Sequence, residues 1–425
     1  MQIEALYQLF LQYPSVQTDT RKLKAGDLYF ALKGENFNGN DFAIQALEKG
    51  AAYAIVDEEI PQDDPHIIKV EHVLHTLQQL AKHHRQQFAI PFIAITGSNG
   101  KTTTKELIHA VLSSHFKTYT TEGNLNNHIG ITLTLLKVKP NAEMAVVEMG
   151  ANHQKEIAGY CTYTLPTHGL INNVGKAHLE GFGGIEGVKK GKGELYDFIR
   201  DTNGSIFINT DLDYLEEMSK GITNKITYGS KDAQTKGQLV SSEPFLVVEI
   251  TSEPTIGKIS TQLVGDYNLP NVLAAVCVGM HFGVPAQKIK SAIESYEPSN
   301  SRSQLVEKDT NKIILDAYNA NPSSMKLAIE NFAKLPADKK VLMLGGMAEL
   351  GEESLAEHQA IIALIRQFNW TQVVLVGGDF AKIEHPFLFF STAGEAQQWF
   401  KSQHFTQTHL LIKGSRSVKM EQILS

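Results

Sequence analysis

The chain has 425 residues, of which 42% are hydrophobic, and its formal net charge is -7. That length exceeds what one hydrophobic core usually organises, and about 150 residues per domain predicts roughly three domains. The negative charge argues against a nucleic-acid partner, and two cysteines are too few for a disulfide framework or for a metal site of paired CxxC motifs. Because no uninterrupted apolar run of about 18 residues and no leader-like start occurs, we expect no membrane insertion and a cytoplasmic location.

The N-terminal part alternates short apolar segments with helical patterns. Strands are predicted at 28–32, 52–56 and 67–70. The helix that follows has its apolar residues on one face: Val73, Leu74, Leu77, Leu80 and Ala81. The polar run at 83–87 then predicts a domain edge, so that the first domain covers 1–87.

From residue 88 the pattern becomes buried strand, turn and helix. Continuous apolar strands are predicted at 92–95, 144–147, 170–171 and 206–208. Such strands between helices are typical of a parallel sheet that is covered on both faces.

Two further features mark the end of this second domain. Between 225 and 264, short alternating segments are broken by Pro244 and Pro254, which predicts an antiparallel patch. Turn-forming residues gather at 297–301, so the second domain is placed at 88–298.

The remaining chain, 299–425, has four more predicted strands between helical patterns, at 313–315, 341–344, 373–376 and 410–412. This is a third α/β unit. The fold class expected from the sequence is therefore α/β in three domains, with a parallel sheet in the central one.

A phosphate-binding loop follows the strand at 92–95. Residues 97–103 read GSNGKTT and lead into an amphipathic helix. The glycines let backbone N–H groups approach an anion, the helix start adds positive partial charge, and Lys101 can reach the outer phosphates. Ala94 and Ile95 depart from the GxxxxGK[ST] form, so the shorter motif carries the signal.

This motif predicts that ATP or GTP is bound by seven consecutive residues: Gly97, Ser98, Asn99, Gly100, Lys101, Thr102 and Thr103. Either Thr102 or Thr103 supplies a hydroxyl that ligates Mg²⁺.

Further motifs lie on both sides of the loop, at 18–22 (TDTRK), 26–34 (GDLYFALKG), 122–127 (EGNLNN), 148–152 (EMGAN), 173–182 (NVGKAHLEGF), 316–322 (DAYNANP), 344–351 (LGGMAELG) and 413–417 (KGSRS). Together with the loop, the chain resembles the Mur ligases over nearly its whole length. The resemblance implies an N-terminal UDP-binding domain, a central P-loop ATPase and a Rossmann-like C-terminal domain that binds the incoming amine.

Within that family, the motifs at 316–322 and 413–417 resemble the ligase that adds D-alanyl-D-alanine to UDP-N-acetylmuramoyl-tripeptide. The activity so implied uses ATP and Mg²⁺ and forms an acyl phosphate on the tripeptide. Its product is the UDP-muramyl-pentapeptide for peptidoglycan synthesis. A monomer is expected.

The residues of the phosphoryl transfer follow partly from position and partly from the resemblance. Glu148 ends an apolar strand at the sheet edge where α/β folds bind ligands, so it is a predicted Mg²⁺ ligand with Thr102. By resemblance His178 ligates a second Mg²⁺, and Lys192 becomes carbamylated and ligates it too. Lys189 and Lys190 compete for the carbamate.

The catalytic set so implied is Lys101, His178, Lys192 and Arg302. Because Arg302 lies just past the second domain boundary, we expect it to reach the γ-phosphate when the third domain swings in. The resemblance adds Asn271, Asp316 and Asn319 to the nucleotide site, although Asn271 can equally cap a helix.

Substrate contacts rest on the resemblance. Thr20 and Arg21 are implied at the UDP phosphates. Asn124, Asn126 and Asn127 are implied at the muramyl part, and Glu349, Lys413 and Arg416 near the dipeptide.

Two rivals remain. One is a sister ligase that adds a single amino acid, or glutamate to folate. The other is a P-loop switch that binds nucleotide without joining anything. The motif at 316–322 argues against the first, and the N-terminal domain argues against the second.

Overall fold

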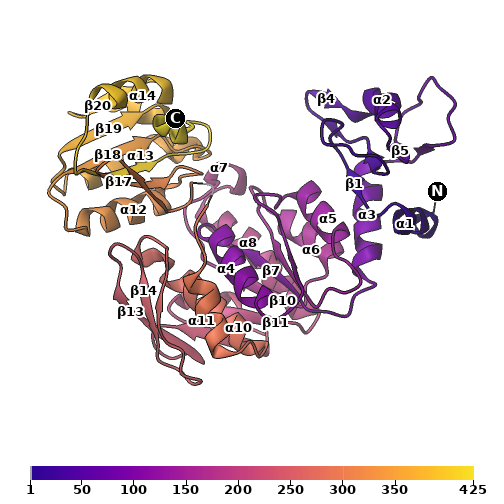
Figure 1. The fold of residues 1–425 in the computed structure, drawn as a ribbon, viewed down its shortest axis with the longest axis horizontal. Coiled ribbons are helices and arrows are strands. Elements are labelled where there is room, and N and C mark those ends of the chain that lie inside the picture. The colour runs from indigo at the N-terminus through magenta and orange to yellow at the C-terminus, as the bar shows by residue number, and fades with distance from the viewer. Residues whose placement is uncertain (1, 300) are drawn as a thin grey trace.

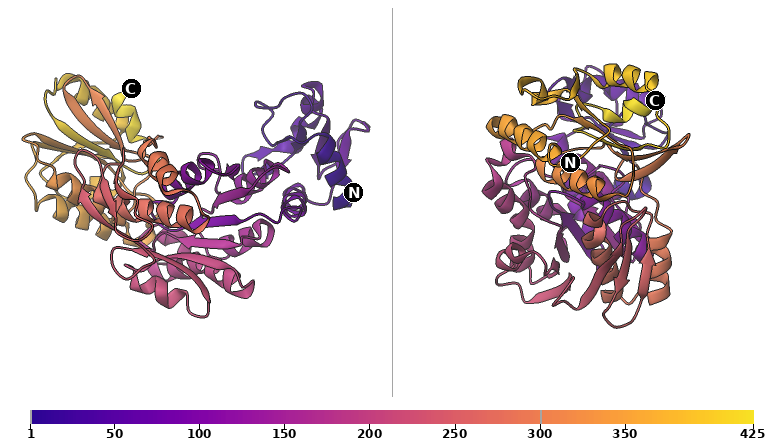
Figure 2. Two further views of the ribbon diagram at one scale, coloured as in Figure 1. Left: turned by 60° about the horizontal axis from the view of Figure 1, so that its bottom comes forward. Right: turned by 90° about the vertical axis from the view of Figure 1, so that its left-hand side faces the viewer.

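The chain folds into three α/β units, seen here in a computed structural model that describes residues 2–299 and 301–425. The N-terminal and C-terminal units lie at opposite ends of the long axis, with the central unit between them (Figure 1, Figure 2). The expected α/β fold class is confirmed. The predicted boundaries fall between α3 and β7 and between α11 and β16.

The N-terminal unit holds a parallel sheet of order β1-β2-β5-β6 and a small β3-β4 hairpin. Its elements are α1 (Ile3–Gln12), β1 (Val16–Gln17), β2 (Leu28–Phe30), β3 (Lys33–Gly34), β4 (Phe37–Asn38), α2 (Ala43–Glu48), β5 (Tyr53–Val56), β6 (Ile67–Lys69) and α3 (Val73–Arg85). The three strands predicted here are present.

Helix α3 is attached to the central unit through its last turn. The Arg85 guanidinium donates to the carbonyl oxygens of Thr164 (2.9 Å), Leu165 (2.9 Å) and Phe88 (2.8 Å). Burial lowers the pKa of Arg85 to about 10. The polar run at 83–87, which was predicted as a domain edge, contains the end of α3, and its His84 and Arg85 are buried against the central unit.

The central unit is a nine-stranded sheet of order β15-β14-β13-β12-β11-β10-β7-β9-β8. Its strands are β7 (Phe92–Thr96), β8 (Thr118–Thr120), β9 (Met144–Glu148), β10 (His168–Ile171), β11 (Ser205–Asn209), β12 (Asn224–Gly229), β13 (Thr235–Ser241), β14 (Val247–Ile250) and β15 (Gly257–Ser260). Strands β7 and β9 are buried along their whole length and pair in parallel. Their carboxyl ends therefore meet at one edge, which carries the site.

Helices cover this sheet: α4 (Lys101–Ser113), α5 (His128–Leu136), α6 (Glu156–Thr164), α7 (Leu179–Phe182), α8 (Ile185–Asp201), α9 (Asp213–Met218), α10 (Leu269–His281) and α11 (Ala286–Glu294). The antiparallel patch exists but is smaller than predicted. Strand β12 pairs in parallel with β11, and the antiparallel ladders join only β13 to β14 and β14 to β15.

The C-terminal unit is a sheet of order β16-β17-β21-β18-β19-β20 with helices α12 (Pro322–Lys334), α13 (Ser354–Ile365) and α14 (Ala393–Ser402). Its strands are β16 (Gln304–Lys308), β17 (Asn311–Asp316), β18 (Lys340–Gly345), β19 (Gln372–Val376), β20 (Leu388–Phe390) and β21 (His409–Lys413). The four predicted strands form the interior of the sheet. The two edge strands, β16 and β20, were missed: both are partly exposed, β16 mixes apolar with charged residues, and β20 has only three residues.

Among the helices of the described residues, we find none whose length and apolar character would let it span a membrane.

Candidate active site

The phosphate loop connects β7 to α4, as the sequence predicts. Gly97 and Gly100 have φ values of 143° and 79°, which favour glycine. A Cβ at Gly100 would lie 2.7 Å from Asn271 Oδ1. The loop therefore needs glycine at this position both for its backbone and for the approach of α10.

Two asparagines after β10 support the loop, and the sequence reasoning gave them no role. Asn173 accepts from the N–H of Ser98 through its carbonyl (2.9 Å) and from the N–H of Asn99 through its side chain (2.9 Å). Asn172 donates to Thr104 Oγ1 at 2.6 Å. Asparagines directly after a buried parallel strand next to β7 are the signal that could have identified them.

The Lys101 ammonium lies inside the loop. Its Nζ donates to the carbonyl oxygens of Gly97 (2.6 Å) and Ser98 (3.3 Å). Burial lowers the pKa of Lys101 to about 8. The Glu148 carboxylate acts to raise this pKa, and the Arg302 guanidinium lowers it further. This ammonium is only partly exposed to water, so an anionic partner would stabilise it.

Beside the loop, Glu148 at the end of β9 is 1% exposed. Its Oε1 accepts hydrogen bonds from Thr102 Oγ1 (3.1 Å) and Asn126 Nδ2 (2.7 Å). Its Oε2 is buried without a hydrogen-bond partner among the described residues. Thr103 also lines the cavity, but Thr102 is the threonine whose hydroxyl bonds to this carboxylate.

These groups fit a hard cation. Among the described residues, no three His, Cys, Asp or Glu side chains gather as a ready-made metal site. Mg²⁺ commonly takes one or two carboxylates together with phosphate oxygens and water, so Glu148 and the Thr102 hydroxyl are a sufficient protein contribution.

His178 lines the same cavity as this pair, whereas Lys192 is not among the cavity-lining residues. His178 Nδ1 contacts Glu349 Oε2 of the C-terminal unit, and this contact lowers the pKa of Glu349. Lys192 is 1% exposed, and its Nζ donates to the carbonyl of Ala151 at 3.1 Å. Burial lowers the pKa of Lys192 well below its usual range, and Lys101 adds to the effect.

Asn271 lies within α10, and its Oδ1 accepts from Thr104 Oγ1 at 3.0 Å. Its Nδ2 donates to Asn268 Oδ1 at 2.8 Å. Among the described residues, the only hydrogen bonds of its side chain are to other side chains, so it links α10 to α4 and does not cap a helix.

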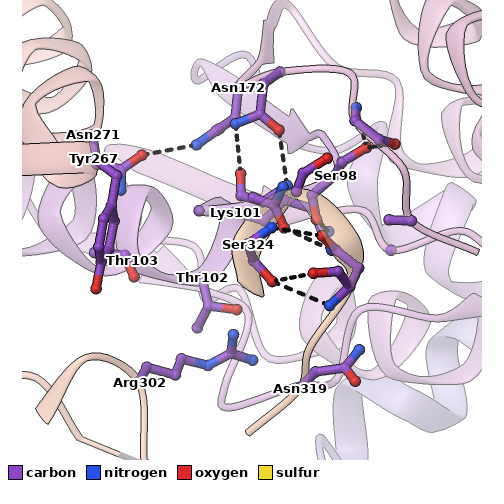
Figure 3. A pocket seen from close by; sticks show the side chains of 18 of the residues that line it. Ser98, Lys101, Thr102, Thr103, Asn172, Tyr267, Asn271, Arg302, Asn319 and Ser324 are labelled. Atoms are coloured by element: carbon purple, nitrogen blue, oxygen red, sulfur yellow. Dashed lines mark hydrogen bonds between the residues drawn. The ribbon is translucent and has the colours of Figure 1, made fainter. Parts of the chain in front are cut away.

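The C-terminal unit contributes to the same cavity, which has a volume of about 850 Å³. Arg302 stacks over the Tyr318 ring at 3.5 Å and extends toward Thr102 and Asn319 (Figure 3). Lys413 Nζ donates to Asp316 Oδ2 at 2.5 Å and to the carbonyl of Asn319 at 3.4 Å. Arg302 thus already lines the cavity that holds Lys101.

Contacts between the two units hold them together in this arrangement, and the sequence did not indicate them. Asn321 caps α12 and also donates to Asn99 Oδ1 on the phosphate loop at 2.7 Å. The backbone N–H of Lys176 donates to Ser323 Oγ at 3.1 Å.

The implied substrate residues are dispersed. Asn124, Asn126 and Asn127 line the cavity, although Asn127 is also the N-cap of α5. Thr20 and Arg21 lie in the N-terminal unit and are not among the cavity-lining residues, and Arg21 pairs with Asp19 at 2.8 Å.

Arg416 also lies outside the cavity lining, where it pairs with Glu421 at 3.4 Å. Lys413 and Glu349 do line the cavity.

Three family models match the chain: the Mur ligase family catalytic domain at 12–85, the Mur ligase middle domain at 95–279 and the Mur ligase glutamate ligase domain at 301–416. Among curated proteins, the UDP-N-acetylmuramoyl-tripeptide–D-alanyl-D-alanine ligase of Escherichia coli is 36% identical, over 96% of this chain and 92% of the relative. The ligase of the same name from Bacillus subtilis is 33% identical with the same coverage.

Solved structures of MurF proteins are also similar to this chain. MurF from Acinetobacter baumannii superposes with a TM-score of 0.86 at 30% identity, covering 96% of this chain and 92% of that one. MurF from Thermotoga maritima, solved in complex with ADP, has a TM-score of 0.86 at 26% identity and covers 97% of both chains.

Proposed function

The chain belongs to the Mur ligase family, and from that premise we propose that it is an ATP-dependent ligase that adds D-alanyl-D-alanine to UDP-N-acetylmuramoyl-tripeptide. The observation that carries this proposal is the near-complete coverage by curated relatives of that name. The product is the UDP-muramyl-pentapeptide used in peptidoglycan synthesis.

The loop at 97–103 binds the phosphates of ATP in this proposal. The N–H groups at the start of α4 and the Lys101 ammonium would face the anionic tail, and Arg302 lines the same cavity. An anionic carboxylate must approach an anionic γ-phosphate, so two fixed cations around the transferring group lower the barrier electrostatically. The acyl phosphate of the tripeptide then reacts with the amine of the dipeptide.

Glu148 and Thr102 would hold Mg²⁺, which supplies charge neutralisation of the phosphates when bound. The fit rests on the buried Glu148 Oε2, which has no hydrogen-bond partner within the described chain. Asn126 orients the carboxylate through its contact with Oε1.

Lys192 is proposed to carry a carbamate. Its burial favours the neutral amine, whose lone pair can form an N–C bond to CO₂ while one proton leaves the nitrogen. The product is an anionic oxygen ligand in place of a cation. Lys189 is partly exposed and pairs with Glu217, and Lys190 is exposed, so neither amine is desolvated in this way.

A test of the carbamate uses Lys192→Ala. We expect ligase activity to be lost and partly restored by short carboxylic acids, and the wild-type protein to show a ¹³C carbamate signal with labelled bicarbonate. Normal turnover by Lys192→Ala would exclude the assignment.

The function itself is tested by phosphate release with UDP-N-acetylmuramoyl-tripeptide, with and without D-alanyl-D-alanine. Release that needs both substrates is expected, and Lys101→Ala should abolish it. Equal release with single amino acids would favour a sister ligase. ATP hydrolysis that ignores both substrates would favour a nucleotide switch.

A further inference from the structure

The segment 301–303 brings Arg302 into the cavity through an unusual backbone. Ser301 and Ser303, which flank the arginine, have φ values of 55° and 47°. Residues other than glycine seldom adopt this left-handed region, and they keep it where surrounding contacts impose it. The contacts of these two serines therefore show what holds Arg302 in place.

Three hydrogen bonds fix the segment. The N–H of Tyr318 donates to the carbonyl of Ser301 at 3.2 Å, and the N–H of Ser303 donates to Asp316 Oδ1 at 3.1 Å. On the other side, the Tyr267 hydroxyl and Ser303 Oγ are hydrogen-bonded at 3.0 Å. Two of these anchors belong to the C-terminal unit, whereas Tyr267 belongs to the central one.

Tyr267 therefore ties this segment to the unit that carries the phosphate loop. It lies in the 3-10 turn Asp266–Asn268, which leads directly into α10, and Asn271 of that helix contacts α4. The Arg302 guanidinium is near enough to Lys101 to lower the pKa of that ammonium, so both cations face one part of the cavity.

We propose that Tyr267 is a positioning residue, whose hydroxyl holds Ser303 and thereby sets Arg302 for phosphoryl transfer, while Asp316 holds the same serine from the C-terminal side. This inference rests on the proposed function, in which Arg302 acts on the outer phosphate of ATP. It assigns Tyr267 a role that is distinct from contact with substrate.

A purely structural role for Tyr267 makes a different prediction. Its ring packs against Gly265, where an added Cβ would lie 2.4 Å from Tyr267 Cε1. Tyr267→Phe keeps that ring and removes the hydroxyl. If packing alone matters, the Phe variant is indistinguishable from wild type.

The experiment compares Tyr267→Phe, Ser303→Ala and the double variant in steady-state phosphate release, with ADP affinity measured by calorimetry. Each single variant should lose about tenfold in kcat, which is the effect of one ordinary hydrogen bond. ADP affinity should stay within about twofold, because ADP lacks the phosphate on which Arg302 acts. The double variant should lose no more than either single one.

Tyr7→Phe is the matched control. Its hydroxyl is hydrogen-bonded to His84 Nδ1 at 3.2 Å, and Tyr7 lies in α1 and is not among the cavity-lining residues. It should keep wild-type kcat. Wild-type kcat in both Tyr267→Phe and Ser303→Ala, or an equal loss in Tyr7→Phe, would overturn the inference. A wild-type protein that releases no phosphate would instead refute the proposed function.

Discussion

Glu148→Gln should raise the stability of the metal-free protein while it removes activity. Glutamine keeps the Oε1 acceptor for Thr102 and Asn126, and it replaces the buried, unpartnered Oε2 by an uncharged amide NH2 group. Burying a charge costs more than burying a neutral polar group, so we expect the free energy of unfolding to rise by about 1–2 kcal/mol. The same change removes a proposed Mg²⁺ ligand.

The loss of that ligand should lower kcat/KM by about 10²–10³-fold, as for other preorganised charge-stabilising groups. Unfolding curves with and without Mg²⁺ and nucleotide measure the first effect, and phosphate release measures the second. Glu143→Gln, on an exposed residue just before the start of the same strand, serves as the control and should change neither quantity. If Mg²⁺ and nucleotide stabilise Glu148→Gln as much as wild type, Glu148 does not bind the metal.

Three further predictions concern the loop and the domain junction. The pKa of Lys101 is lowered to about 8, and bound phosphates favour its ammonium form, so ATP affinity should fall as pH rises from about 8 toward 10.5. Calorimetry should show that ATP binding takes up protons. An affinity that does not change with pH would contradict this prediction. Gly100→Ala should weaken ATP binding at least about tenfold, because alanine in the left-handed backbone region costs about 1–2 kcal/mol and its Cβ would displace Asn271. Unchanged ATP affinity would refute this geometry of the phosphate loop. Arg85→Leu leaves three carbonyl oxygens without their hydrogen-bond donor. Denaturant titration should show that the free energy of unfolding falls by about 3 kcal/mol. A fall of less than about 1 kcal/mol would show that water replaces these hydrogen bonds.

Local chemistry explains what the sequence predicted well. The phosphate loop is contained in seven consecutive residues, 97–103, and glycines and a lysine in this pattern typically bind phosphate. Interior strands such as β7 and β9 are continuous apolar runs, so their positions were readable from residue type alone.

Contacts between segments that are distant in the sequence could not be predicted from it. Asn126 was expected at a substrate and bonds to Glu148, and Lys413 was expected near the dipeptide and bonds to Asp316. A polar side chain carries no local sign of which distant group it will meet. The same limit applies to Arg85, which lies in the polar run predicted as a domain edge: nothing in that run indicates that its guanidinium binds backbone carbonyls of α6 and beyond.

The two outer units are attached to the centre by different means, and this has a mechanical consequence. On the N-terminal side a helix is anchored directly through Arg85, so that side has a fixed span from the phosphate loop. On the C-terminal side the connection runs through the segment 301–303, where a few hydrogen bonds hold an uncommon backbone. Opening of the cavity should therefore pivot about this second joint and break the contact of the α12 cap with the phosphate loop, while the N-terminal unit keeps its place on the central one.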